Sequence, residues 1–329
     1  MPIARNERIL LTGGTGFIGR AVLKTLTAGG IHPLVITRRS TSVSTDSYSI
    51  AKLDLTDRTD TVRIIREFRP DVIIHLAGAT LLDDPTGKYC DELNFRATAA
   101  MLDAAAENGV KRAILLGSAS EYGDNQIPFR EDMALRPSSA YSRSKAMAAE
   151  YAAGLYERTG FDSVILRIFT AYGPGQPANM FLSQLVKHAI LNHRFKMSDG
   201  TQQRDFVFVD DVAAAIVAAV DAAPTAARVV NIGSGRAYAL KHVAKMVWEK
   251  CGAENANLEI GAIGRSGEDK FDTLADIQVA EKKLGWRPAT DFEIGLVVTI
   301  EAFRQALLQE SSSDHDGLRQ PSLKASKVE

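Results

Sequence analysis

Two side chains that could exchange a proton with a substrate lie one helical turn apart, in the segment Tyr141-Ser142-Arg143-Ser144-Lys145. On a helix this spacing places Tyr141 and Lys145 on the same face. A free tyrosine ionises at about pH 10 and is a poor base at neutral pH, but a neighbouring ammonium favours the phenolate. The pair therefore predicts that Tyr141 gives a proton to, or takes one from, a hydroxyl or carbonyl group, with Lys145 sustaining that exchange.

A serine ends the apolar segment 112–118, which the sequence predicts to be a buried strand. The carboxyl end of a central strand faces the crevice in which open α/β sheets bind their ligands. We therefore expect the Ser118 hydroxyl to lie beside Tyr141 and to hydrogen-bond the same substrate oxygen. Ser120, two residues further on, is a second candidate for this role.

A glycine-rich segment near the N-terminus, Gly13-Gly14-Thr15-Gly16-Phe17-Ile18-Gly19, lies between a predicted strand at 8–12 and a predicted helix at 17–28. Glycine permits a tight turn and lets backbone amides approach a pyrophosphate at the helix N-terminus. Between these elements the pattern predicts a dinucleotide site. The residues expected to hold the dinucleotide here are Gly13, Gly16, Phe17, Ile18 and Gly19. A nicotinamide there would exchange hydride while Tyr141 exchanges the proton.

The second strand, predicted at 35–37, is followed by Arg38 and Arg39 rather than by a carboxylate. An acid at this point would bind the 2′-hydroxyl of the adenosine ribose and favour NAD. Guanidinium groups pair with phosphate, so the two arginines favour NADP, with NAD as the other possibility. The alternative interpretation is a solvated pair of surface charges.

The elements that must position these residues alternate along the chain. Strands are predicted at 8–12, 35–37, 71–76, 112–118 and 162–168, and helices at 17–28, 58–68, 91–108 and 141–158. This alternation predicts an α/β fold, a Rossmann doubly wound parallel sheet covered on both faces.

The alternation becomes irregular after Gly173. We expect a dinucleotide-binding domain at 1–173, completed by about 205–235, and a smaller, interleaved C-terminal substrate lobe mainly at 174–309. Further helices are predicted at 179–193, 211–222 and 240–251, and further strands at 206–209 and 229–232. The polar tail 310–329 is predicted to be disordered.

Over nearly all of residues 8–305 the chain resembles an extended short-chain dehydrogenase/reductase of the NAD-dependent epimerase/dehydratase family. The resemblance rests on the glycine segment and on a series of further motifs. These are Asp54-Leu55, His75-Leu76-Ala77-Gly78-Ala79, the Ser118 segment, Tyr141 with Lys145, Leu166-Arg167-Ile168-Phe169, Tyr172-Gly173-Pro174-Gly175, Arg204-Asp205-Phe206, Asn231-Ile232-Gly233 and Leu284-Gly285-Trp286-Arg287-Pro288.

The resemblance implies a role for individual residues. Ser118, Tyr141 and Lys145 match the catalytic set, and Tyr141 and Lys145 would also contact the cofactor. Asp54 and Leu55 match the pair that holds adenine, whereas Ala77, Gly78 and Ala79 match the strip along the cofactor phosphates and ribose. Asn94 matches a buried helix asparagine near the cofactor. The residues expected to contact a nucleotide-sugar substrate are Ser118, Ser120, Thr170, Asn179, Arg204 and Arg265, with Arg204 on its diphosphate.

Two departures from the family pattern narrow the reaction. Family dehydratases carry an Asp-Glu pair directly after the catalytic Ser/Thr, where this chain has Ala119 and Ser120. Many epimerases carry Asn where this chain has Thr170. Glu121, directly before Tyr122, makes the segment similar to reductases of nucleotide-linked 4-keto-6-deoxy sugars, and we name Glu121 as the next residue to test should Tyr141 not be the proton donor.

Three functions follow. The first is reduction by NADPH of the 4-keto group of a nucleotide-linked (6-deoxy)hexose, with Tyr141 as proton donor. The alternative is an NAD-dependent nucleotide-sugar 4-epimerase that uses the same residues to oxidise and re-reduce the sugar. The third is a non-catalytic, NAD(P)-binding sensor or scaffold, which an intact Ser118, Tyr141 and Lys145 set disfavours.

Composition bounds the partners. A net charge of −1 gives no overall electrostatic footprint for nucleic acid. Two cysteines and the lack of a long apolar run indicate a cytoplasmic protein without a disulfide framework or membrane span. The histidines show no metal-ligand spacing, so no metal is expected, and Trp248 and Trp286 are interpreted as packing residues.

The resemblance also implies an assembly. The family's usual homodimer pairs the helices at 91–108 and 141–158 with their copies in a second subunit. The small residues Ala146, Ala148, Ala149, Ala152 and Ala153 on the second of these helices would allow a close approach.

Overall fold

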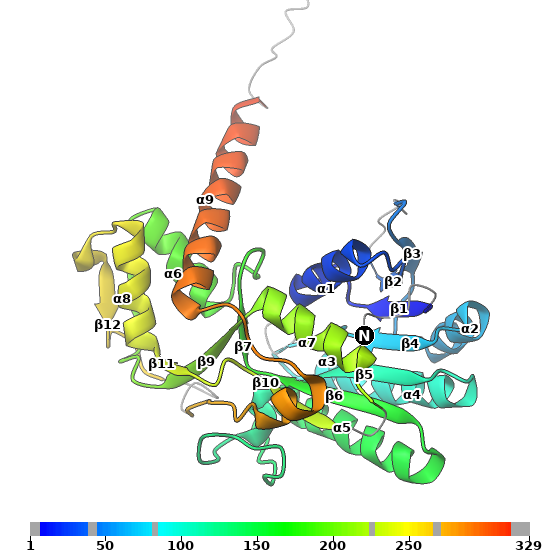
Figure 1. Cartoon of the computed structure of the whole chain (residues 1–329). Helices are drawn as coiled ribbons and strands as arrows, with labels where there is room; N and C mark the ends of the chain where they lie inside the picture. The colour runs from blue at the N-terminus through cyan, green and yellow to red at the C-terminus, as the bar shows by residue number, and fades with distance from the viewer. Residues whose placement is uncertain (1–6, 39–44, 81–84, 224–227, 266–270, 317–329) are drawn as a thin grey trace, which may run out of the picture.

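In the computed structural model, the centre of the chain is a sheet of seven parallel strands in the order β10-β6-β5-β4-β1-β2-β3 (Figure 1). The structure describes residues 7–38, 45–80, 85–223, 228–265 and 271–316, without the side chains of 310–316. The strands of the sheet are β1 (Ile9–Thr12), β2 (Leu34–Thr37), β3 (Ser49–Lys52), β4 (Val72–His75), β5 (Arg112–Ser118), β6 (Asp162–Ile168) and β10 (Val229–Ile232). The predicted Rossmann sheet is therefore confirmed.

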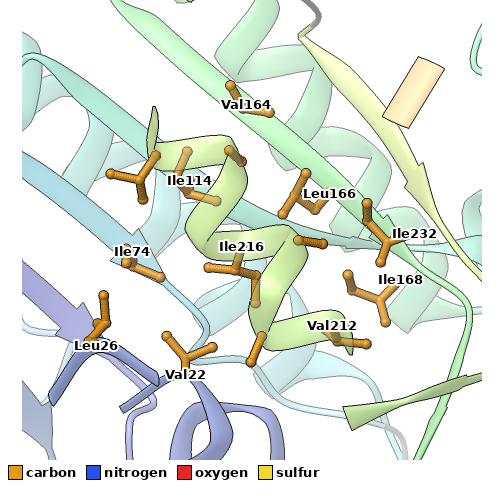
Figure 2. Close-up of a cluster of buried hydrophobic side chains, with 14 of the residues drawn as sticks. Val22, Leu26, Ile74, Ile114, Val164, Leu166, Ile168, Val212, Ile216 and Ile232 are labelled. Carbon is orange, nitrogen blue, oxygen red and sulfur yellow. The ribbon is translucent and has the colours of Figure 1, made fainter. Parts of the chain in front are cut away.

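Helices cover both faces of this sheet because its strands carry apolar side chains in both directions. Along β1, Ile9 and Leu11 enter one core and Leu10 enters the other. Helices α1 (Phe17–Ala28) and α7 (Val209–Asp221) cover the first face. Figure 2 shows this layer, with Ile216 of α7 lying among side chains of α1 and the central strands.

The second face is covered by the remaining helices of the Rossmann part. They are α2 (Arg58–Phe68), α3 (Lys88–Cys90), the π-helix η1 (Asp91–Ala97), α4 (Thr98–Glu107) and α5 (Ala140–Thr159). Caps define α5, since the Ser139 side chain accepts a hydrogen bond from the Ser142 amide and Gly160 ends the helix at a φ of 74°. The N-terminus of α5, which carries Tyr141, is thereby fixed.

The smaller lobe has a core of its own, built around Trp248 and Leu185. Its strands are β7 (Thr170–Tyr172), β9 (Gln203–Phe208) and β11 (Ala237–Ala239) in one sheet, and β8 (Phe195–Met197) with β12 (Leu258–Ile260) in another. Its helices are α6 (Phe181–Ile190), α8 (Leu240–Cys251) and α9 (Phe292–Asp316). The chain returns to the Rossmann part through α7 and β10. Short helical turns complete the chain at η2 (Ala119–Tyr122), η3 (Asn255–Asn257) and η5 (Ala280–Leu284).

Some elements differ from the prediction. The sequence did not predict strand β3, because its side chains are only half-buried at the edge of the sheet and form no apolar run. The predicted helix 91–108 is a π-helical turn followed by α4. Helix α9 continues through Asp316, past the predicted start of the disordered tail at 310, because no Gly or Pro interrupts it between Leu296 and Asp316. Residues 317–329 lie outside the described part of the chain.

The tryptophans fill cores as predicted. Trp248 is fully buried in the smaller lobe and donates its ring N–H to the Glu254 carbonyl over 3.1 Å. Trp286 donates to the Asp211 carbonyl over 3.0 Å and packs beside α7. Each ring thus anchors a connection between elements rather than a ligand.

Candidate active site

A cleft of about 520 Å³ opens at the carboxyl ends of the central strands, where the smaller lobe meets the Rossmann sheet. This is the edge at which doubly wound sheets bind their ligands. From the Rossmann side the cleft is lined by the glycine segment and by Ser118, Tyr141 and Lys145. From the other side it is lined by Gln176, Met180, Arg204 and Phe206. The structure therefore brings the predicted catalytic residues together with the predicted cofactor cradle.

The glycine cradle is built so that side chains are excluded from it. A Cβ added to Gly13, whose φ is 69°, would lie 2.6 Å from the Ala77 nitrogen, and one at Gly19 would lie 2.0 Å from the Gly13 carbonyl. Gly16 is the N-cap of α1. Because no side chain fills the turn, the amides at this helix N-terminus face the cleft, and the chain fits a pyrophosphate there. Gly13, Gly16, Phe17, Ile18 and Gly19, from which the sequence predicts a dinucleotide site, all line the cleft.

The strip after β4 lies along the same wall. Gly78 and Ala79 line the cleft, whereas Ala77 packs behind them against Gly13. Asn94 is buried and clamps this strip, since its side chain accepts from the Ala79 amide over 2.8 Å and donates to the Ala79 carbonyl over 2.9 Å. Its Nδ2 also donates to Ser144 Oγ over 3.0 Å. Asn94 is thus a positioning residue that ties the cofactor strip to α5.

Lys145 reaches across the cleft floor from α5. Its Nζ donates to the Leu116 carbonyl over 2.9 Å and would lie 3.2 Å from a Cβ at position 78. Burial lowers the pKa of the Lys145 ammonium to about 8, against opposing contributions from Glu121 and then Cys90 that raise it. Gly78 therefore leaves the space that the lysine occupies.

His75, for which the sequence suggested no metal role, is a core residue beneath the site. Its ring nitrogens lie 2.7 Å from Thr12 Oγ1 and 3.0 Å from Thr98 Oγ1. Burial, with the Lys145 charge, lowers the pKa of His75 to about 3. The ring is neutral and joins β1, β4 and α4. Among the residues that the structure describes, no group of His, Cys, Asp and Glu side chains could hold a metal ion.

Ser118 stands at the junction of β5 and the short helix η2. Its Oγ accepts from the Ser120 amide over 3.2 Å and lies 2.9 Å from Ser120 Oγ. Both serines line a side pocket of about 280 Å³ that shares Ser118, Thr170 and Arg204 with the main cleft. The two hydroxyls are therefore one hydrogen-bonded pair where the side pocket meets the cleft.

Glu121 is not placed to donate a proton in the cleft. Its carboxylate is fully buried behind Ser118 and lines neither the main cleft nor the side pocket. Its two oxygens accept from the Ser118 amide over 2.7 Å and from Arg167 Nε over 2.8 Å. The sequence names this residue as a reserve proton donor, but the structure makes it an acceptor within the protein.

The predicted substrate contacts divide into two groups. Thr170 and Arg204 line the cleft, and the Arg204 guanidinium is held by the Gln203 and Phe271 carbonyls. Asn179 is exposed and lies outside the cleft lining, as does Arg265. Arg265 pairs with Asp199 at 2.6 Å, an ion pair that sequence spacing could not reveal because it joins residues from separate loops.

The predicted adenosine contacts lie beyond the main cleft. Arg38 bonds the Tyr89 hydroxyl, and its guanidinium lies over that ring, 5.3 Å from the ring centre. Hydrogen bonds from Thr56, chiefly its backbone amide, lower the pKa of Asp54, to which the Arg38 charge also contributes. Leu55 is buried. Arg39 lies outside the described residues.

Several cleft residues carry no sequence signal that we recognised. Gln176 is buried between the Ala171 carbonyl and the Ser183 hydroxyl, and it lines the cleft next to Pro177. Pro174 and Gly175 belong to a recognised motif of the sequence, but nothing in that motif indicates a role for the glutamine that follows it.

No helix in the described part of the chain is long and apolar enough to cross a membrane.

Curated relatives match almost the whole chain. A UDP-glucuronate 4-epimerase of Thermodesulfobacterium geofontis is 26% identical over 88% of this chain and 94% of its own length. A dTDP-L-rhamnose 4-epimerase of Burkholderia thailandensis is 27% identical over 88% of this chain and 93% of its own.

Solved structures agree with these relatives. The UDP-glucose 4-epimerase of Thermotoga maritima, solved with UDP-glucose, superposes with a TM-score of 0.85 at 26% identity, over 91% of this chain and 99% of that one. The Thermus thermophilus UDP-glucose 4-epimerase in complex with NAD gives 0.81 at 25% identity, with the same coverages of 91% and 99%. The sequence model of the NAD dependent epimerase/dehydratase family matches residues 9–233. The cleft, its cradle and these matches together show that the chain is a member of the NAD dependent epimerase/dehydratase family.

Proposed function

We propose that this enzyme inverts the configuration at C4 of a nucleotide-linked hexose, using NAD held in the Rossmann cleft. The observation that carries the proposal is the convergence of Ser118, Tyr141 and Lys145 with the glycine cradle in one cleft. The 4-epimerases of UDP-glucuronate, dTDP-L-rhamnose and UDP-glucose among its relatives favour inversion over simple reduction, which was the first expectation from sequence. Ala119 and Ser120, in place of an acidic pair, disfavour dehydration.

The residues of the cleft divide the work of such a reaction. Tyr141 takes the proton of the C4 hydroxyl and later returns it, while Ser118 hydrogen-bonds the same oxygen. Lys145 supplies the positive charge that favours the Tyr141 phenolate. Arg204, which lines the cleft, holds the diphosphate by charge-assisted hydrogen bonds. The glycine cradle would hold the dinucleotide, whose nicotinamide would supply the acceptor and donor for the C4 hydride.

A second candidate rests on Arg38. No carboxylate follows β2, and Arg38 lies at its end, which favours the 2′-phosphate of NADP. Under this alternative the same residues reduce a nucleotide-linked 4-keto sugar with NADPH. Arg38→Asp should then shift the ratio of the NADPH and NADH dissociation constants at least tenfold toward NADH. An unchanged ratio contradicts the NADP preference.

One experiment separates the two functions. The purified enzyme is analysed by mass spectrometry for retained dinucleotide, and is then incubated with UDP-glucose, UDP-glucuronate and dTDP-L-rhamnose without added cofactor. The 4-epimerase produces the C4 epimer of one of them, and Tyr141→Phe lowers that rate by about 10²–10⁴. Consumption of NADPH with a dTDP-4-keto-6-deoxyhexose, and no epimer, supports the reductase. Normal turnover by Tyr141→Phe refutes both.

We also propose a homodimer through α4 and α5, although with different contacts from those first expected. Ala148, Ala149 and Ala152 are buried within the subunit and expose little surface to a partner. This is because α5 packs against η1, α4 and the central strands. Met147 is 39% exposed and Ala153 is also exposed, so these residues would form the contact. Light scattering that gives a monomer at micromolar concentration would contradict this assembly.

A further inference from the structure

A buried ion pair lies directly behind the catalytic serine. Glu121 is 0% exposed and Arg167 is 4% exposed, and their side chains meet at 2.8 Å. Neither lines the main cleft. Taking two charges out of water is costly, and apolar residues of similar volume are often as stable or more stable. A pair at this place therefore calls for a role other than stability.

We propose that Glu121 and Arg167 are positioning residues for the C4 chemistry: the pair fixes the β5–η2 junction that presents Ser118, and the Glu121 carboxylate sustains the Lys145 ammonium. The inference rests on the proposed function of the cleft. It assigns Glu121 a task that differs from proton donation.

The first part of this role follows from the contacts of the carboxylate. Glu121 Oε1 accepts from the Ser118 amide over 2.7 Å and closes a capping box with the Ser118 side chain. A Cβ at position 117 would lie 2.7 Å from that oxygen, so the carboxylate occupies space that only a glycine leaves. The main chain of Ser118 is therefore held by a group that cannot move without displacing β5.

Arg167 holds the carboxylate from β6. Its Nη1 donates to the Tyr122 hydroxyl over 2.9 Å, and the guanidinium lies 4.7 Å from the centre of that ring. The Tyr122 hydroxyl donates to Asn231 Oδ1 over 2.7 Å, which extends the network to β10. Three neighbouring strands thus fix the orientation of one carboxylate behind Ser118.

The second part concerns the charge near Lys145. Lys145 Nζ donates to the Leu116 carbonyl, and the Glu121 carboxylate lies against the next two residues of the same strand, Gly117 and Ser118. The other titratable groups that act on or near the ammonium are Cys90 of α3, the neutral His75 of β4 and Tyr141 of the same helix. Among these groups Glu121 is the carboxylate, and its charge opposes the burial that lowers the Lys145 pKa. Removing that charge should lower the Lys145 pKa further.

The test compares Glu121→Gln with Asp162→Asn. Gln keeps an oxygen for the Ser118 amide but removes the charge. Asp162 is the matched control, because it forms a second buried pair with Arg112 at 2.6 Å, at the opposite ends of the same strands β5 and β6. We expect Glu121→Gln to lower kcat at least tenfold with KM within twofold, and to move the alkaline limb of the pH–kcat profile to lower pH. Asp162→Asn should lower Tm while leaving kcat and the limb in place.

Three results would overturn the inference. The first is a Glu121→Gln variant whose kcat and pH–kcat profile equal those of the wild type. The second is a shift of the alkaline limb in Asp162→Asn that equals the shift in Glu121→Gln. The third, should Glu121→Gln not fold, is an unchanged kcat in Glu121→Asp. Asp keeps the charge on a shorter side chain, so Glu121→Asp should lower kcat but leave the alkaline limb of the pH–kcat profile at its wild-type pH.

A readout without turnover separates this inference from the proposed function. In a double-mutant cycle of unfolding, Lys145→Met should raise Tm more in the Glu121→Gln background than in the wild type, because the ammonium there lacks its carboxylate. Additive effects on Tm overturn the charge role even if no nucleotide sugar is turned over. Failure of the wild type on every nucleotide sugar, with the expected coupling in Tm, would overturn the proposed function alone.

Discussion

Replacing Lys145 with methionine should stop turnover and yet make the fold more stable at neutral pH. Met has nearly the length of Lys and fills the same path across the cleft floor without a charge. The ammonium lies beneath the cofactor strip, where burial lowers its pKa from 10.5 to about 8. The folded protein therefore holds a charge that its own surroundings disfavour.

The size of the stability change follows from the lowered pKa of Lys145. At about 1.4 kcal/mol per pH unit, the lowering of the Lys145 pKa from 10.5 to about 8 corresponds to at most about 3.5 kcal/mol of stability that the ammonium costs below pH 8. The unfolded chain binds the proton between about pH 8 and 10.5 while the folded chain does not, so wild-type stability rises with pH across that window. The lost hydrogen bond to the Leu116 carbonyl is a separate, pH-independent cost of about 1–3 kcal/mol.

The assay is urea unfolding of the cofactor-free wild type and Lys145→Met at several pH values from 7 to 10.5. The difference in unfolding free energy should change by up to about 3.5 kcal/mol across that range, with the variant at its greatest advantage at the lowest pH. Groups common to both proteins cancel in this difference. A difference that stays constant with pH would refute the buried ammonium, whatever its sign.

Two further predictions concern residues packed against this lysine. Gly78→Ala places a Cβ 3.0 Å from Asn94 Oδ1 and 3.2 Å from Lys145 Nζ, so it should weaken dinucleotide binding at least tenfold by calorimetry. Gly264→Ala, whose Cβ would meet no atom within 4 Å, is the control, and equal losses in both variants would contradict the reasoning. The pKa of His75 is about 3 in the folded chain and 6.5 in the unfolded chain, so the stability that it contributes is present above about pH 6.5 and is lost as pH falls toward 3. In chemical unfolding, the stability difference between the wild type and His75→Asn should therefore shrink or reverse as the pH falls through this window. A pH-independent difference would show that the ring is not buried in its neutral form.

The sequence by itself determined the parts of this protein that depend on local spacing. The glycines of the cradle, the strand that ends at Ser118 and the helical turn between Tyr141 and Lys145 are each read from neighbouring residues, and all of them line the cleft. These features can be predicted locally, because a tight turn needs glycine and two side chains four residues apart on a helix share a face.

Only the tertiary structure decided the contacts between distant segments. Glu121 meets Arg167 because β5 and β6 are adjacent, with Ser118 paired to Ile168 in register. Arg265 faces Asp199 rather than the cleft, and three alanines of α5, Ala148, Ala149 and Ala152, are buried within the subunit. Residue type says that a charge or a small side chain is present, but which surface it faces depends on packing against elements tens of residues away. A buried carboxylate can therefore resemble a proton donor in the sequence and be a fixed acceptor in the fold.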